Sequence, residues 1–257
     1  MFEVNKSIFD DGNNRPDLPA RTGDIQQVHI RDLLEELDSP VENLCLGHFD
    51  YIGEFTAKKQ RDPSSDLFSN VGAFFRPNYE RGLLINALIK KYKVKSYLEI
   101  GFGRGYSCFC AAMTMSQIEG GKVTTVDPAL DENQLKSLSD IFPGEWFSKI
   151  NFIKATSDDF FKDSTEQFDM IYIDGDHRYE AVLKDWNNAK NCIKKIILFD
   201  DYHLPGKKQK DMDVSNVIDS IQDHEKRLVK MDRRIFFDDR RVCDDDLDYG
   251  QVLIIKE

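Results

Sequence analysis

The sequence predicts an α/β protein built on a mostly parallel sheet with helices on both faces. From about residue 93 onward, short apolar runs alternate with helical patterns, and the runs are KSYLEIG, KVTTVD, INFIKA, FDMIYID and KKIILFD. Each run has the length of a strand and ends in turn residues. Strands that alternate with helices connect through right-handed crossovers, which places helices over both faces of a parallel sheet.

The segments between and before these runs carry the spacing of helices with one buried face. In RYEAVLKDW, the residues Tyr179, Val182, Leu183 and Trp186 follow an i, i+3, i+4, i+7 pattern. The segment DVSNVIDSIQ has the same spacing, and a helix over residues 78–92 is expected to lead into the first strand. A further helix is expected over residues 24–37, inside an otherwise irregular N-terminal region.

Two apolar segments near the C-terminus, RLVKMDRRIFF and QVLIIK, are separated by the acidic stretch DDRRVCDDDLDYG. That stretch leaves no room for a crossover helix, so the two strands should form an antiparallel hairpin. Their exposed edges make a homodimer an expected assembly. We therefore divide the chain into an N-terminal cap or substrate-binding segment, residues 1–75, and a core domain, residues 76–257.

Composition excludes several classes of function. With 35 basic and 46 acidic residues the net charge is −11, which argues against a nucleic-acid partner. No apolar run reaches the roughly 18 residues that span a bilayer. The N-terminal sequence lacks the apolar stretch of a signal peptide. The five cysteines form no CxxC pair. We therefore expect a cytoplasmic protein with reduced thiols and no membrane partner.

The first strand of the sheet runs into a glycine-rich turn, EIGFGRGYS, which contains Glu99, Gly101, Gly103 and Ser107. Glycines permit a tight turn and close approach of a ligand, and amides at the start of the next helix can hold an anionic group. The alternative is an ordinary loop. The next strand ends at Asp127, where an acid can accept hydrogen bonds from ribose hydroxyls. Together the two features favour a ligand that contains a nucleoside.

The spacing of the glycines helps to choose between nucleosides. Dinucleotide sites carry GxGxxG, whereas this turn has glycines at alternate positions with Glu99 two residues ahead. An acid beside the turn suits a ligand with an ammonium group and disfavours a pyrophosphate. S-adenosylmethionine therefore fits better than NAD, which makes a dehydrogenase a remote alternative.

Three carboxylates are expected at neighbouring strand ends. FDMIYID ends at Asp174, and KKIILFD is followed by a second acid, which gives Asp200 and Asp201. Because parallel strands end at a common edge of the sheet, these acids should meet there and repel one another. A bound divalent cation such as Mg²⁺ would relieve the repulsion. The alternative is that the pair only caps the strand end and begins a turn.

The pattern ExGxGxG, the acid that ends the second strand and the segment FDMIYIDGDH resemble class I S-adenosylmethionine-dependent methyltransferases. More narrowly, LEIGFGRGYS, KATSDDF, YIDGDH and LFDDYH resemble the cation-dependent O-methyltransferases of the catechol and macrocin types. The resemblance covers about residues 93–203. It implies a Rossmann-like methyltransferase fold with a mostly parallel seven-stranded sheet, and it makes residues 76–257 the methyltransferase domain.

The resemblance also assigns roles to individual residues. It places the methionine end of the cofactor at the glycine turn, with Ser107 on its carboxylate, and the ribose at Asp127. It places the adenine at Ser157 and Asp158, although both could simply open a helix. The metal ligands would be Asp174, Asp200 and Asp201, as in the macrocin type, which has an acid pair at this strand end.

The catalytic base is expected at His177, three residues after Asp174, where catechol-type enzymes carry a lysine. His203 is a competing base, and His177 could instead cap a helix. Asp174 and His177 are thus the predicted catalytic residues.

The expected function is cation-assisted transfer of a methyl group from S-adenosylmethionine to a hydroxyl of a small molecule, either a sugar or a catechol-like ring. Two alternatives remain. One is a metal-independent methyltransferase that acts on nitrogen or on protein, and the other is a methyltransferase-like module that binds the nucleoside without catalysis.

Overall fold

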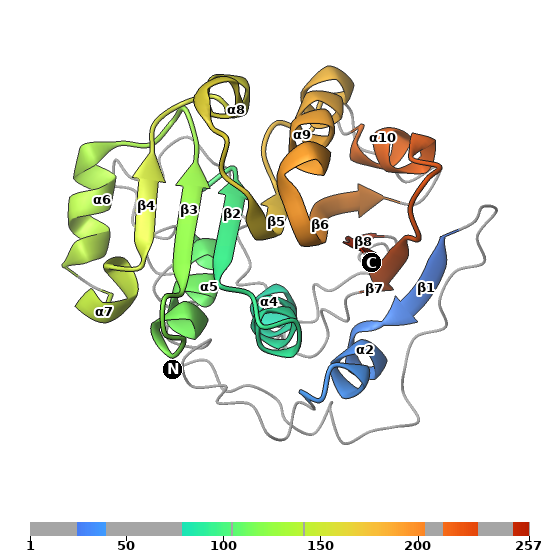
Figure 1. Ribbon diagram of the computed structural model, residues 1–257, viewed down its shortest axis with the longest axis horizontal. Coiled ribbons are helices and arrows are strands. Elements are labelled where there is room, and N and C mark those ends of the chain that lie inside the picture. Colours follow the sequence, from blue (N-terminus) through green and yellow to red (C-terminus); the bar gives the residue numbers. More distant parts are fainter. Residues whose placement is uncertain are drawn as a thin grey trace, which may run out of the picture.

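The structure is a computed structural model that describes residues 25–39, 79–103, 105–140, 142–203, 213–230 and 249–256. These residues form an eight-stranded sheet in the order β1-β7-β8-β6-β5-β2-β3-β4, with helices on both faces (Figure 1). The predicted α/β fold is confirmed, with one strand more than expected. The expected domain boundary near residue 75 lies outside the described residues.

The parallel part of the sheet consists of the strands that the apolar runs predicted. They are β2 Ser96–Ile100, β3 Lys122–Val126, β4 Ile150–Ile153, β5 Phe168–Ile173 and β6 Ile193–His203. Neighbours among them in the sheet are parallel. Their carboxyl ends therefore point to one edge, where ligands of open α/β sheets bind.

The two C-terminal strands are antiparallel, as predicted. β7, Arg227–Lys230, pairs with β8, Tyr249–Ile255, and β8 also pairs antiparallel with β6. β8 therefore lies inside the sheet, between β7 and β6.

The expected helix over residues 24–37 is wrong at its start. Gln26–His29 form strand β1, which pairs parallel with β7 and is followed at once by helix α2, Ile30–Glu36. A four-residue segment has no strong periodicity of its own, so the backbone partners offered by β7 decide its conformation. β1 is the eighth strand, and it covers the β7 edge from which a homodimer was expected.

Helices cover the two faces of the sheet in separate groups (Figure 1). On one face lie α2, α4 Tyr79–Lys91, α5 Tyr106–Ser116, α6 Glu132–Ser139 and α7 Gly144–Phe147. On the other lie α8 Ser157–Asp163, α9 Tyr179–Cys192 and α10 Val214–Ser220. The helices predicted over residues 78–92 and in RYEAVLKDW and DVSNVIDSIQ are α4, α9 and α10.

Strand side chains alternate between the two cores that these helices cover. Tyr172 and Leu198 pack on the α4 and α5 side, whereas Ile173 and Phe199 pack on the α9 and α10 side. This alternation follows from the two-residue period of a strand. The same alternation directs the neighbouring acids Asp200 and Asp201, at the end of β6, to opposite faces of the sheet.

None of the helices in the described ranges is long and apolar enough to cross a membrane. Cys108, Cys110 and Cys192 are buried free thiols. The other two cysteines lie outside the described residues.

Candidate active site

The carboxyl ends of three adjacent strands build the floor of the site. Gly101 follows β2 and donates its amide to Val126 O at 2.9 Å, while Asp174 follows β5 and donates its amide to Ile100 O at 2.9 Å. Asp127 follows β3. The sheet ladder thus continues one residue past each strand and fixes where the turns begin.

Positive φ angles shape the glycine turn after β2. Gly101 has φ of 92°, Gly103 of 51° and Gly105 of 84°. A Cβ at Gly101 would lie 2.2 Å from Asp174 O, whereas a Cβ at Gly103 would meet nothing within 4 Å. Gly101 is therefore required both by its backbone conformation and by the contact between β2 and β5.

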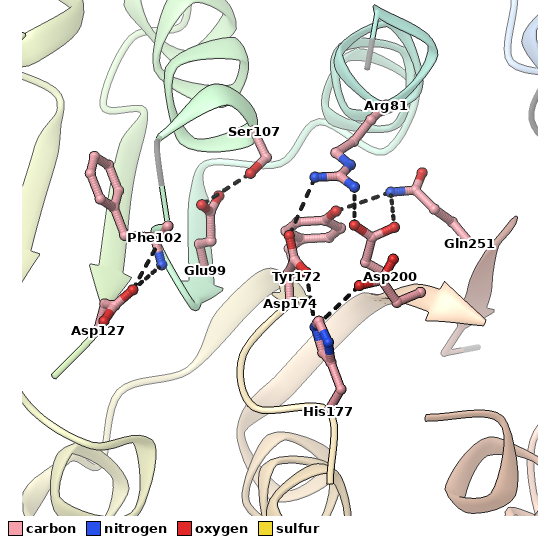
Figure 2. A network of polar contacts seen from close by, with 12 residues as sticks. Arg81, Glu99, Phe102, Ser107, Asp127, Tyr172, Asp174, His177, Asp200 and Gln251 are labelled. Atoms are coloured by element: carbon pink, nitrogen blue, oxygen red, sulfur yellow. Dashed lines mark hydrogen bonds and ion pairs between the residues drawn. The ribbon is translucent and has the colours of Figure 1, made fainter. Parts of the chain in front are cut away.

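Asp127 holds the glycine turn in place. Its Oδ2 accepts hydrogen bonds from Phe102 N at 2.9 Å and Gly103 N at 3.1 Å (Figure 2). Its Oδ1 accepts a hydrogen bond from Ala129 N at 2.7 Å. A carboxylate has about four acceptor positions, so these amides leave it one for a ribose hydroxyl. Asp127 therefore stabilises the glycine turn and keeps one acceptor position for a ligand.

Glu99 and Ser107 lie behind the turn and are buried. Ser107 Oγ donates to Glu99 Oε1 at 3.1 Å (Figure 2). The Tyr97 hydroxyl donates to Glu99 Oε2 at 3.1 Å. Burial, followed by the nearby charge of Asp174, raises the pKa of Glu99 well above its usual range. Ser107 is thus engaged with Glu99, the residue whose charge was expected to face an ammonium group.

The predicted adenine residues have different surroundings. Asp158 is on the outside of α8, where it accepts hydrogen bonds from Lys184 Nζ at 3.0 Å and Asn188 Nδ2 at 3.2 Å. Ser157 points inward and donates to Asp185 Oδ1. Thr156 caps α8 by accepting a hydrogen bond from Asp159 N at 3.1 Å, so neither predicted residue is the N-cap.

A cavity of about 650 Å³ opens over the ends of β2, β3 and β5. This volume is in the range that holds a cofactor or a drug-sized ligand. Of the residues predicted from the sequence, its lining includes Gly101, Gly103, Asp127, Ser157, Asp158 and Asp174, but neither Glu99 nor Ser107.

Asp174, His177 and Asp201 form a compact cluster next to this cavity. His177 Nε2 lies 3.6 Å from Asp174 Oδ1 and 3.2 Å from Asp201 Oδ2 (Figure 2). One donor atom from each of the three residues lies within 4.8 Å of the others. The cluster offers two oxygens and one nitrogen, a donor set that suits a divalent cation such as Mn²⁺ as well as Mg²⁺.

Asp200 does not belong to that cluster, contrary to the prediction that three carboxylates meet at one point. Its side chain is 1% exposed, forms an ion pair with Arg81 Nη2 and accepts a hydrogen bond from Gln251 Nε2 at 3.3 Å (Figure 2). Consecutive strand residues face opposite sides of a sheet. Asp200 therefore faces α4, and Asp201, which has φ of 53° at a register shift between β6 and β8, faces α9.

Arg81, on helix α4, contacts both Asp174 and Asp200. Its Nη1 lies 3.3 Å from Asp174 Oδ2 while its Nη2 pairs with Asp200, and its guanidinium lies 5.9 Å from the centre of the Tyr172 ring. Gln251 also donates to the Tyr172 hydroxyl at 3.1 Å. The repulsion expected between these acids is thus compensated in part by a side chain of the protein.

The electrostatics of the cluster reflect its burial and its crowding. Burial and the charge of Asp200 raise the pKa of Asp174 to about 7, although Arg81 opposes the shift. The contact with Asp174, together with the charge of Asp201, raises the pKa of His177 to about 9. In this arrangement, therefore, His177 carries a proton at neutral pH and serves as a counter-ion of the two carboxylates.

The other acid and histidine near the cluster are placed outside it. Asp176 forms an ion pair with Arg178 at the surface. His203, the competing base, pairs with Tyr249 in the ladder between β6 and β8.

Sequence reasoning missed Arg81, Gln251 and Asp185. A single arginine in the first turn of an apolar helix does not form a pattern that indicates a functional role. Gln251 is a single polar residue in an apolar strand, which does not indicate one either. Asp185 carries a detectable signal, because it occupies a buried position of α9 with Val182 and Trp186. An acid on the apolar face of an amphipathic helix indicates a specific partner.

Residues 98–202 match the model of a protein family described as a methyltransferase domain. Over this range the chain is similar to methyltransferase domains. The matched range runs from β2 to the end of β6 and holds the glycine turn, the cavity and the acidic cluster. Among the curated proteins, none matches the sequence.

Solved structures show that the chain has the fold of O-methyltransferases. An O-methyltransferase from Bacillus cereus, in complex with SAH, is 14% identical with a TM-score of 0.58, covering 89% of this chain and 97% of its own. The O-methyltransferase TomG from Streptomyces achromogenes, in complex with SAM, is 15% identical with a TM-score of 0.57. The match covers 79% of this chain and 88% of TomG. A putative caffeoyl-CoA O-methyltransferase from Staphylococcus aureus is 16% identical with a TM-score of 0.52. The match covers 88% of this chain and 96% of the Staphylococcus protein. The resemblance of the sequence to S-adenosylmethionine-dependent O-methyltransferases is thereby confirmed.

Proposed function

We propose that the methyltransferase domain transfers a methyl group from S-adenosylmethionine to a hydroxyl group of a small molecule, assisted by a divalent cation. The observation that carries the proposal is the position of the Asp174, His177 and Asp201 cluster beside the cavity over β2, β3 and β5. Structural neighbours named as O-methyltransferases and described with SAM or SAH bound support the choice of cofactor.

The residues that line the cavity support an assignment of the parts of the cofactor. Asp127, with one acceptor position left over from the turn amides, would hold a ribose hydroxyl. Ser157 lies where the cavity meets α8, which is the end proposed for the adenine. The sulfonium methyl would then lie toward Asp174, since that residue lines the cavity and also belongs to the cluster.

The cluster fits a divalent cation, with Asp174 and Asp201 as ligands and His177 as ligand or base. Asp200 would contribute only after release from Arg81. A cation bound there would lower the pKa of a substrate hydroxyl and orient its oxygen.

In the transfer, the substrate oxygen attacks the methyl carbon, the bond from carbon to sulfur breaks, and the hydroxyl proton leaves to His177 Nε2. To accept that proton, His177 must first lose the one that Asp174 and Asp201 hold on it. A divalent cation held by Asp174 and Asp201 would favour that loss. The products are a methyl ether and S-adenosylhomocysteine, and alignment of oxygen, carbon and sulfur supplies most of the acceleration.

One observation favours a second candidate, metal-independent methyl transfer. Arg81 already neutralises part of the acidic group, so the acids can coexist without a metal ion. In that case the acceptor could be a nitrogen or a protein side chain.

The two candidates are separated by titrating the protein with S-adenosylmethionine in a calorimeter, with EDTA, Mg²⁺ or Mn²⁺ present. Transfer to catechol-like and sugar acceptors is then followed by mass spectrometry. The proposal expects cofactor binding in all three conditions and methylation of a hydroxyl only when a cation is present. Turnover that is unaffected by EDTA would establish the metal-independent candidate, and absence of cofactor binding would refute both.

A further inference from the structure

Helix α9 buries a carboxyl group that the proposed transfer does not use. Asp185 is 4% exposed and lies on the face of α9 that also buries Val182, Trp186 and Ala189. An ionised carboxylate at such a position costs several kcal/mol unless it is paired. The same residue lines the cavity, so its carboxyl group is at the boundary between the helix and the ligand space.

One oxygen of Asp185 is bonded and the other is available. Ser157 donates to Oδ1, and no residue within the described ranges donates to Oδ2. Oδ2 faces Gly175, where an added Cβ would lie only 3.4 Å away. The glycine thus leaves open the approach to this oxygen from the turn after β5.

Within the part of the chain that the structure describes, no cationic side chain forms an ion pair with Asp185. Burial raises its pKa to about 6, and the charges of Asp158 and Asp176 add to the shift, whereas Ser157 and the more distant Lys184 oppose it. Lys184 itself is bonded to Asp158. A neutral donor delivered by a ligand is therefore the partner that suits Oδ2 best.

The neighbouring acid is already occupied. Both oxygens of Asp158 accept hydrogen bonds from α9, from Lys184 to Oδ2 and from Asn188 to Oδ1. Of the acids on α8 and α9 that line the cavity, Asp185 thus combines burial, an inward orientation and a free acceptor oxygen.

We propose that Asp185, oriented by Ser157, recognises the exocyclic amine of the cofactor's adenine through Oδ2 and so makes the site specific for adenine. This inference rests on the proposed function. The N6 amine of adenine donates hydrogen bonds, whereas hypoxanthine and guanine present a carbonyl oxygen at the same position. A carboxylate attracts the amine and repels the carbonyl. The hydrogen bond from Ser157 to Oδ1 fixes the carboxyl plane so that Oδ2 points to the ligand.

The test compares two ligands that differ only at that position, S-adenosylhomocysteine and S-inosylhomocysteine, by calorimetry at pH 7.5 with the wild-type protein. The wild type is expected to bind the adenosyl compound at least tenfold more tightly. Equal affinity for the two ligands would overturn the inference, and this measurement requires no variant. If neither ligand binds, the proposed function itself fails.

Variants then locate the residue responsible. In Asp185→Asn, whose amide can donate to a carbonyl, the preference should fall to threefold or less. Asp159→Asn, which removes an exposed acid of α8 outside the cavity, is the matched control and should keep the full preference. Loss of the preference in Asp158→Asn, with its retention in Asp185→Asn, would overturn the inference.

Ser157→Ala provides a second check in case Asp185→Asn does not fold. It keeps the carboxylate but removes the hydrogen bond that orients it, so the preference for the adenosyl ligand should fall severalfold. An unchanged preference would contradict the orienting role of Ser157.

Discussion

The ion pair between Arg81 and Asp200 should be a major source of stability in the metal-free protein. Asp200 is 1% exposed and Arg81 13% exposed, so Arg81→Met leaves a buried carboxylate without its cation. Breaking a buried pair in this way typically costs about 3 to 5 kcal/mol. The hydrogen bond that Gln251 donates to Asp200 remains, which places the expected loss near the lower end, about 3 kcal/mol.

A double-mutant cycle separates the pair from its surroundings. Asp200→Asn removes the buried charge and leaves Arg81 bonded to Asp174, so it should cost only about 1 to 2 kcal/mol. The double variant should be more stable than Arg81→Met alone, because the uncompensated charge is gone. The resulting coupling energy should be about 2 kcal/mol.

Urea unfolding at pH 7 with EDTA present, followed by circular dichroism, measures all four proteins. The matched control is Lys184→Met, which breaks the exposed pair with Asp158, whose side chains are 63% and 48% exposed. This control should cost less than about 1 kcal/mol. The reasoning is refuted if Arg81→Met loses no more than the control, or if the effects of the two single substitutions simply add.

Three further predictions concern the turn, the cluster and the buried acid. Gly101→Ala should lower the free energy of unfolding by more than about 3 kcal/mol, and Gly103→Ala by about 1 kcal/mol, because both have positive φ but only the first added Cβ meets backbone; equal losses in urea unfolding would contradict this. Asp201→Asn should weaken Mn²⁺ binding at least tenfold and Asp200→Asn less than threefold, measured by electron paramagnetic resonance of free Mn²⁺, and the reverse order would exclude the proposed ligand set. Since burial raises the pKa of Asp185 from 3.8 to about 6, the folded protein holds that proton more tightly than the unfolded chain. The stability of the wild type relative to Asp185→Asn should therefore fall by about 3 kcal/mol as pH rises from about 3 to about 7, with about 2 kcal/mol of the loss between about pH 4 and about pH 6. Urea unfolding across this range tests it, and a constant difference would argue against a buried, isolated carboxyl group.

Local patterns were sufficient for most of the fold. β2 to β6 were predictable because a parallel strand covered by helices is a short apolar run with turn residues at its ends. Helices α9 and α10 were predictable because one apolar face leaves a regular spacing in the sequence. The glycine turn and Asp127 were predictable for the same kind of reason, since positive φ angles and strand ends impose residue types on nearby positions.

Contacts between distant parts of the chain determined the rest. Gln26 to His29 became a strand because β7, some two hundred residues later, offers backbone partners. Asp200 and Asp201 look equivalent in the sequence, but strand alternation sends one to Arg81 and the other to His177.

By itself, therefore, the sequence determined strands β2 to β6, the helices α9 and α10, the glycine turn and the edge of the sheet that carries the site. Only the tertiary structure decided which acids share a point, which of them a guanidinium neutralises, and that Asp185 faces the cavity. The physical reason is that periodicity and turn chemistry are local properties of the chain. The pairing of buried charges depends instead on side-chain directions from elements far apart in sequence.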